Sequence, residues 1–146
     1  MAEPLFYVDR SEILDGRIEQ ARDGMLDLAA FVAEREPQLM AYHFYLDESA
    51  STMSVVAVHP DSASMERHLE LGGPKFRAFG SLIRMRSIDV YGQPSPSVVD
   101  RLRQKAEYLG GASVTLHTHQ AGFSRLIDDR SDRSDRSDRR DDLPHD

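Results

Sequence analysis

His68 is the side chain of this sequence best suited to chemistry. It lies beside Met65 and Leu69 in a stretch whose three- and four-residue spacing places all three on adjacent positions of one helical face. An imidazole titrates near neutral pH, so His68 could act as a base on a phenolic hydroxyl. The alternative is a half-buried histidine at the edge of the apolar stripe, bonded to backbone or water.

Four consecutive side chains, Tyr42, His43, Phe44 and Tyr45, form an aromatic cluster on a predicted strand, and alternate members point to opposite faces. Aromatic walls suit planar ligands, and a tyrosine hydroxyl can orient a quinol. We therefore expect Tyr42 and Tyr45 to act with His68 as catalytic residues. Core or dimer packing explains the same aromatic residues. The expected substrate-binding residues are His43, Phe44, Met65, Leu69, Phe76 and Phe79.

A second pair of histidines, His117 and His119, has the His-x-His spacing that places both rings on one face of a strand. Such pairs occur in metal sites, but a site needs further ligands and a second shell. His43 or His59 would have to converge on the pair. A metal site there is a weak alternative, and no metal is our main expectation.

The elements that must position these residues begin with a hairpin from Leu39 to His59. Two runs with period-2 spacing flank the polar turn DESAST, as expected for paired antiparallel strands. Met40, Tyr42, Phe44 and Leu46 share one face of the first run. Large apolar or aromatic groups occupy both faces, so each face needs a cover. Helices can cover one face, and a second subunit is the simplest cover for the other.

Helical and strand patterns flank the hairpin on both sides. A short strand at Leu5 to Asp9 precedes a helix from about Asp15 to Arg35, which Pro37 ends. Asp61 and Ser62 stand where a helix begins, and Gly72, Gly73 and Pro74 are expected to interrupt that helix. The remaining elements are a strand at Leu82 to Tyr91, a helix that starts at Ser95-Pro96 and stops at Gly110-Gly111, and a short strand at Ser113 to His119.

Composition limits the classes of protein that fit. The chain has 146 residues, 40% of them hydrophobic, which supports one core of ordinary domain size. The absence of cysteine excludes disulfides and thiol nucleophiles. A net charge of -7 argues against a general nucleic-acid binder. The N-terminus has no basic segment followed by an apolar run, and no apolar run is long enough for a bilayer, so we expect a cytoplasmic protein without membrane contact.

The last 20 residues have a different composition. Residues 127–146 contain three Arg-Ser-Asp repeats that begin at Arg130 and almost no apolar side chains. Such a segment cannot bury enough surface to offset its conformational entropy. We therefore predict one domain at residues 1–126, followed by a disordered tail.

The predicted order strand, helix, strand, strand, helix, strand is that of an α+β ferredoxin-like β-α-β-β-α-β sandwich, here with an added C-terminal helix and short strand. With a second sheet face that needs a cover, it resembles the dimeric α/β-barrel proteins, and among them the antibiotic biosynthesis monooxygenase domain. The segment from Ala41 to Phe79 carries this resemblance. A strand ending Val56 to His59 leads into a helix with Met65 to Leu69, and a glycine- and proline-containing break precedes Phe76.

This resemblance implies a homodimer with a pocket between the sheet and the helices of each subunit. It also implies a monooxygenase that oxidises a small phenol- or quinol-type aromatic molecule without a metal or flavin, so we expect no cofactor. His68 matches a position where this superfamily often has a histidine. The haem-degrading relatives use a tryptophan, which this chain lacks, so haem degradation is not expected. A homodimer of the same fold that binds a small molecule without catalysis, or serves a structural role, is the alternative function, and a metal-binding protein that uses His117 and His119 is the second.

Overall fold

The structure is a computed structural model that describes residues 4–126. The tail predicted at residues 127–146 lies outside the described residues. The elements follow one another in the order β1 (Leu5–Ile13), α1 (Ile18–Arg35), β2 (Ala41–Asp47), β3 (Thr52–His59), α2 (Ser62–Ala78), η1 (Phe79–Ser81), β4 (Ile83–Tyr91), α3 (Pro96–Tyr108) and β5 (Ser113–His117). The first six predicted elements and the two added ones are therefore confirmed.

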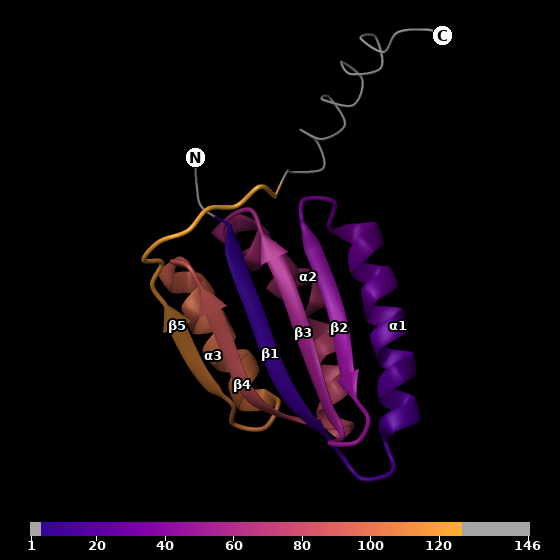
Figure 1. Ribbon diagram of the computed structural model, residues 1–146. Helices are drawn as coiled ribbons and strands as arrows, with labels where there is room; N and C mark the ends of the chain where they lie inside the picture. The colour runs from indigo at the N-terminus through magenta and orange to yellow at the C-terminus, as the bar shows by residue number, and fades with distance from the viewer. Residues whose placement is uncertain (1–3, 127–146) are drawn as a thin grey trace, which may run out of the picture.

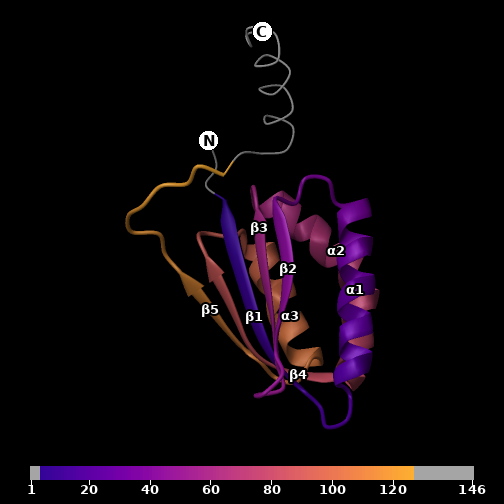
Figure 2. The ribbon, with the colours of Figure 1, turned by 45° about the vertical axis from the view of Figure 1, so that its right-hand side comes forward.

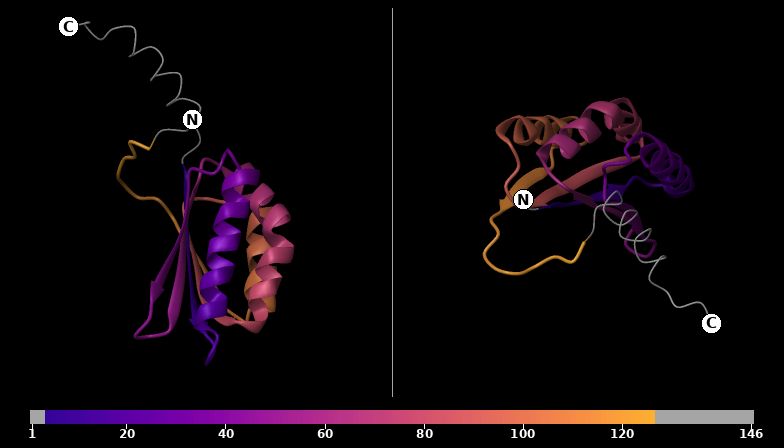
Figure 3. Two further views of the ribbon diagram at one scale, coloured as in Figure 1. Left: turned by 90° about the vertical axis from the view of Figure 1, so that its right-hand side faces the viewer. Right: turned by 90° about the horizontal axis from the view of Figure 1, so that it is seen from above.

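The five strands form one sheet in the order β2-β3-β1-β4-β5 (Figure 1). Neighbouring strands are antiparallel except β4 and β5, which are parallel and joined by α3. All three helices lie on one side of the sheet (Figures 2 and 3). We call this side the covered face and the opposite side the open face. This is a ferredoxin-like sandwich with one added α-β unit, as predicted.

The strand pattern decides which side chains meet the helices. In β1 the odd-numbered residues from Leu5 to Ile13 are buried, while the even-numbered ones are partly or fully exposed. In the hairpin, Tyr42 lies opposite Ala57 and Phe44 opposite Val55, so these pairs share the covered face. His43 and Tyr45 are exposed on the open face.

Capping residues fix where two of the helices begin. The side chain of Asp61 accepts a hydrogen bond from the backbone N–H of Ser64 at 2.9 Å, and Ser95 accepts one from Val98 at 3.4 Å. Pro96 occupies the first turn of α3, where no backbone donor is needed. Both starts agree with the sequence prediction.

The predicted interruption of the second helix at Gly72, Gly73 and Pro74 is wrong. Helix α2 is continuous through these residues to Ala78. A Cβ atom on Gly72 would lie only 2.2 Å from the ring of Phe76, so the glycine makes room for that ring instead of ending the helix. Pro74 removes one intrahelical hydrogen bond, and packing of the apolar face offsets that loss.

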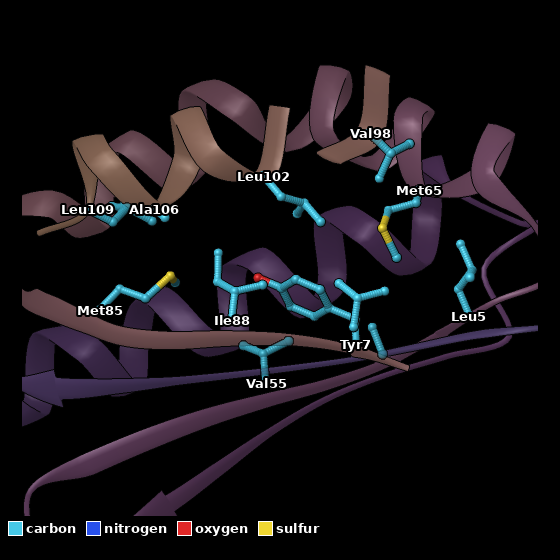
Figure 4. Close-up of a cluster of buried hydrophobic side chains, with 12 residues drawn as sticks. Leu5, Tyr7, Val55, Met65, Met85, Ile88, Val98, Leu102, Ala106 and Leu109 are labelled. Carbon is cyan, nitrogen blue, oxygen red and sulfur yellow. The ribbon is translucent and has the colours of Figure 1, made fainter. Parts of the chain in front are cut away.

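Two clusters of apolar side chains fill the layer between the sheet and the helices. Figure 4 shows the cluster under α3, where the ring of Tyr7 lies beside Ile88, between Leu102 of the helix and Val55 of the sheet. The other cluster packs α1 against the sheet and the end of α2, and it includes Met25, Leu28, Phe76 and Phe79. Within residues 4–126, no helix is long and apolar enough to cross a membrane.

Candidate functional site

His68 lies on α2 at the covered face and forms a buried pair with Glu36. Its Nδ1 is 2.8 Å from Glu36 Oε2 and 3.0 Å from Oε1. Glu36 directly follows α1, and both side chains are almost fully buried. Since a carboxylate accepts hydrogen bonds, Nδ1 carries the proton and Nε2 keeps the basic lone pair. A histidine held by a carboxylate in this way has the form of a general base with its orienting group.

Three rings surround the imidazole of His68. The ring centroids of Tyr42, Phe76 and His59 lie 5.1, 5.1 and 5.4 Å from it. His59, the last residue of β3, is hydrogen-bonded through Nδ1 to Ser64 Oγ at 2.9 Å. The walls around His68 are therefore aromatic, as a site for a planar ligand requires.

Burial shifts the proton affinities of this cluster. It lowers the pKa of His59 from 6.5 to about 3, with His68 and Lys105 acting in the same direction. Burial also lowers the pKa of His68, although the bond to Glu36 acts against it. The pKa of Tyr42 is raised well above 10 by burial, helped by the Asp9 and Glu36 carboxylates. At neutral pH, His68 is thus a neutral base beside a tyrosine that keeps its proton.

A second polar centre lies in the same layer, where β1 meets α3. Lys105 Nζ donates to the hydroxyl of Tyr7 at 3.0 Å, and that hydroxyl donates to Asp9 Oδ2 at 2.6 Å. Lys105 Nζ is 3.9 Å from the same carboxylate oxygen and 4.1 Å from the centroid of Phe76. Burial raises the pKa of Asp9 against the pull of Lys105 and Tyr7, and it lowers the pKa of Lys105.

The two centres are neighbours. The ring of Phe76 contacts both His68 and Lys105. The charge of Asp9 also acts on His68, since each changes the pKa of the other. Together they place a base, two carboxylates, an ammonium and two phenols in one largely apolar layer.

The structure brings most of the sequence-predicted site residues together but separates two of them. His68 and Tyr42 are in contact, and Phe44 packs edge-on against Tyr42 at 5.3 Å. Tyr45 is 56% exposed on the open face, and His43 lies beside it. The sheet therefore stands between Tyr45 and His68, and the catalytic role of Tyr45 stays a prediction. The other predicted residues on the covered side are Met65, Leu69, Phe76 and Phe79.

The histidine pair is not arranged as its spacing suggested. Strand β5 ends at His117, so His119 lies beyond it. His117 Nε2 is 2.8 Å from Asp89 Oδ1, and its ring stacks on Tyr91 with a centroid distance of 4.3 Å. In the part of the chain that the structure describes, no three His, Asp or Glu side chains are grouped to hold a metal ion.

Sequence reasoning missed five residues of the two centres: Tyr7, Asp9, Glu36, His59 and Lys105. Asp9 alternates with Leu5 and Tyr7, so a charge on an apolar strand face was the visible signal. Lys105 likewise follows Leu102 by three residues on the apolar stripe of its helix. Glu36 follows Val32 by four residues, so it continues the apolar stripe of α1 one residue past the end of the helix.

Comparisons with known proteins find the same fold in solved structures. MupZ from Pseudomonas fluorescens superposes with a TM-score of 0.66 and 16% identity, over 84% of this chain and 95% of MupZ. SnoaB, a cofactor-independent oxygenase from Streptomyces nogalater, superposes with a TM-score of 0.54 and 20% identity, over 64% of this chain and 96% of SnoaB. This chain has an antibiotic biosynthesis monooxygenase-like fold.

A further structure with this fold is a candidate antibiotic biosynthesis monooxygenase from Bacteroides thetaiotaomicron, with 11% identity and a TM-score of 0.52 over 60% of this chain and 85% of its own. No family model matches the sequence, and no curated protein matches it significantly. Nearly all of MupZ corresponds to most of this chain, whereas nearly all of SnoaB corresponds to about two thirds of it.

The surface also has a hollow of about 290 Å³ at the end of α3, away from His68. Its lining residues are Arg103, Ala106, Glu107, Gly111, Ala112 and Val114. None of the sequence-predicted site residues lines it.

Proposed function

We propose that this protein is a cofactor-independent monooxygenase that acts on a small aromatic molecule of the phenol or quinol type. The observation that carries the proposal is the buried His68–Glu36 pair, with a basic Nε2 among aromatic rings. The likeness to the cofactor-independent oxygenase SnoaB supports the reaction class. In this proposal Glu36 is a positioning residue, because it acts through His68.

The reaction begins when His68 Nε2 takes the proton of a substrate hydroxyl. The resulting anion carries negative charge on a ring carbon that still bears a hydrogen, and that carbon bonds to O₂ to give a peroxide. The peroxide takes the proton back from His68. Loss of water then leaves a carbonyl, so one oxygen atom enters the product and the other leaves as water. The substrate carbon supplies the electrons, and no external reductant is needed.

Tyr42 orients the substrate in this proposal. Because its pKa is raised well above 10, its hydroxyl stays protonated and can donate a hydrogen bond to the substrate oxygen. Phe44, Phe76 and Phe79 provide apolar ring contacts, with Phe44 stacked on Phe79 at 6.3 Å. Exclusion of water by these rings favours the anion's reaction with O₂ over its reprotonation by solvent.

Oxygen uptake tests the proposal. Purified protein is incubated with a panel of quinols and hydroxylated polycyclic ketones in air and under argon. We expect an oxygen-dependent product from at least one substrate, with kcat/KM lowered about 10²- to 10⁴-fold in His68→Gln. His117→Gln is the matched control, because His117 lies at the other edge of the sheet, and its kcat/KM should stay at the wild-type value. Absence of oxygen-dependent turnover throughout the panel would contradict the proposal.

The proposal includes a cytoplasmic homodimer that buries the open face. Phe6, Val8 and Val56 are only partly buried there, and Tyr45 is largely exposed. Apolar groups on an open sheet face favour association with a second sheet. His43 and Tyr45 are then interface residues, and their substrate roles depend on what the second subunit brings to them.

Light scattering at micromolar concentration tests the dimer. Val56→Asp places a charge in the centre of the open face and should convert the dimer to a monomer. Leu26→Asp is the control, because Leu26 is 73% exposed on α1, on the helical side. A wild-type monomer would remove this part of the proposal.

The second candidate is a homodimer that binds a small aromatic molecule without turnover. The almost complete burial of His68 favours it, because a substrate can reach Nε2 only if neighbouring side chains move. Ligand-dependent stabilisation together with no oxygen uptake would select this function over the first.

A further inference from the structure

Two buried polar atoms on β1 have no hydrogen-bond partner among residues 4–126: Asp9 Oδ1 and Ser11 Oγ. Their side chains are only 2% and 1% exposed. Both residues belong to the odd-numbered set of β1, so both face the layer between the sheet and the helices. Leaving such a group unpaired costs about 1–3 kcal/mol, so each one in a folded protein needs a specific cause.

The side chains opposite these positions offer no polar partner, and the backbone N–H of Val55 acts on the Asp9 carboxylate while Oδ1 stays without a hydrogen bond. The register partners of Asp9 and Ser11 on β3 and β4 are Val55, Ile88, Met53 and Met85. The pairing of β1 with β4 also shifts between Arg10 and Ser11. Irregularities of this kind re-aim side chains and are frequent next to functional sites.

Lys105 brings unused donors to the same place. Its ammonium group has three N–H bonds, and one of them is donated to the Tyr7 hydroxyl. Asp9 Oδ2 is 3.9 Å away, beyond hydrogen-bond distance. The Tyr7 hydroxyl accepts from Lys105 and donates its one proton to Asp9, so it has no further proton to donate. The centre therefore offers a free carboxylate acceptor and spare ammonium donors, and the unpaired hydroxyl of Ser11 follows two residues along the same face of β1.

A hydroxyl group complements this set. Its O–H can donate to Asp9 Oδ1 while its oxygen accepts from Lys105 or Ser11. A ligand carboxylate would be repelled by Asp9, and an ammonium group would have no acceptor to offer Lys105. We propose that Asp9, Ser11 and Lys105 form a second binding subsite, which holds a hydroxyl group of the ligand whose ring lies at His68.

This inference rests on the proposed function for the position of the ring, and it narrows the substrate class. The substrate would carry two hydroxyl groups, one deprotonated at His68 and the other held against β1. Contact of both His68 and Lys105 with the ring of Phe76 makes the subsites neighbours. Helix α3 thus supplies a specificity-determining residue, Lys105.

Titration calorimetry under argon tests the subsite without turnover. The probes are resorcinol, which has a second hydroxyl, and 3-methoxyphenol, whose second oxygen cannot donate. We expect resorcinol to bind about tenfold more tightly to the wild type, the effect of one charge-assisted hydrogen bond of about 1.4 kcal/mol. Equal affinities, or no binding of either probe, would overturn the subsite.

Two variants locate the effect. In Asp9→Asn the amide oxygen accepts the hydrogen bond from the Tyr7 hydroxyl, as Oδ2 does in the wild type. The amide NH₂ group then lies at the position of Oδ1, so a hydrogen-bond donor replaces an acceptor there. The preference should then shift toward 3-methoxyphenol. Ser11→Ala should shrink the resorcinol preference by severalfold, and it keeps the test valid if Asp9→Asn does not fold by circular dichroism.

The control is Ser54→Ala, which removes a serine on the open face of β3 and should leave the preference unchanged. A preference that survives both Asp9→Asn and Ser11→Ala would overturn the subsite. Intact probe preference with no oxygen uptake would contradict the oxygenase proposal alone, so the two failures are distinguishable.

Discussion

Strand β1 carries an ion-paired carboxylate on each face of the sheet, and the two pairs differ in their exposure to water. On the open face, Arg86 of β4 pairs with Glu12 of β1, and both side chains are about half exposed. On the covered face of the same two strands, Asp9 lies beside Ile88 and is paired through Tyr7 with Lys105. Water screens the first pair, whereas burial removes that screening from the second and makes each of its charges costly without the other. Burial, more than residue type, decides which charges can do chemistry here.

Breaking one buried and one exposed ion pair should show the largest difference in stability. Lys105→Met leaves Asp9 buried without its counter-charge and should lower the free energy of unfolding by about 3–5 kcal/mol at pH 7. Lys75→Met removes the exposed partner of Asp27 and should cost under about 1 kcal/mol. Urea denaturation measures both values. Similar small losses would show that the covered centre is screened as well as the surface.

The next largest effect is the pH dependence of stability. The folded-state pKa of His59, about 3, lies below its ordinary 6.5, so its contribution is complete above pH 6.5 and is lost as the pH falls toward 3. The loss is about 1.4 kcal/mol per pH unit, or about 2 kcal/mol at pH 5. His68 acts in the same direction and the raised pKa of Asp9 in the opposite one.

Urea denaturation between pH 7.5 and 4.5 measures this slope. His59→Gln removes one titrating group and should flatten the dependence by about one proton. An unchanged slope in that variant would show that His59 titrates near its ordinary pKa.

A smaller effect is expected from Glu36→Gln. The amide keeps an acceptor for His68 Nδ1–H but loses the charge, which should cost about 1–1.5 kcal/mol and lower the pKa of His68 further. Glu34→Gln, at an exposed position of the same helix, is the control. Histidine NMR titration and urea denaturation measure the two changes. A His68 pKa that rises in Glu36→Gln would refute the role given to Glu36.

The smallest effect is expected on the open side. Tyr91 stacks on His117 with an angle of 14° between the rings. Tyr91→Ser should lower the free energy of unfolding by about 0.5–1 kcal/mol, and a double-mutant cycle with His117→Ala isolates the ring contact. A coupling energy above 2 kcal/mol would mean that this side is as tightly coupled as the covered face.

The sequence predicted helices and strands correctly where the spacing of apolar residues and the capping residues indicated the same element. The alternation around Tyr42 and Phe44 predicted both the hairpin and the faces of its side chains, and Asp61 and Ser95 marked helix starts. Gly72 led to a wrong prediction, because the sequence does not distinguish a glycine that makes room for the Phe76 ring from a glycine that ends a helix. Only the three-dimensional packing separates these two uses.

The candidate site was less predictable, because its members come from distant segments. His68 stood out by its place on an apolar face, but its partner Glu36 is 32 residues away with no periodic relation to it. Tyr45 was grouped with Tyr42 by neighbourhood in sequence, whereas alternation along β2 sends the two rings to opposite faces. Asp9 and Lys105 were visible as charges on apolar stripes, yet nothing in the sequence pairs them.

The pairing of β1 with α3 also orders events during synthesis. Tyr7 and Lys105 are 98 residues apart, so the first strand leaves the ribosome long before its counter-charge does. Until α3 docks, Asp9 must stay hydrated, and the covered side of β1 cannot close. The nascent chain can align its first four strands early, but the water around that carboxylate leaves only after α3 has been made. Docking of α3 is therefore the step of folding that removes the Asp9 carboxylate from water.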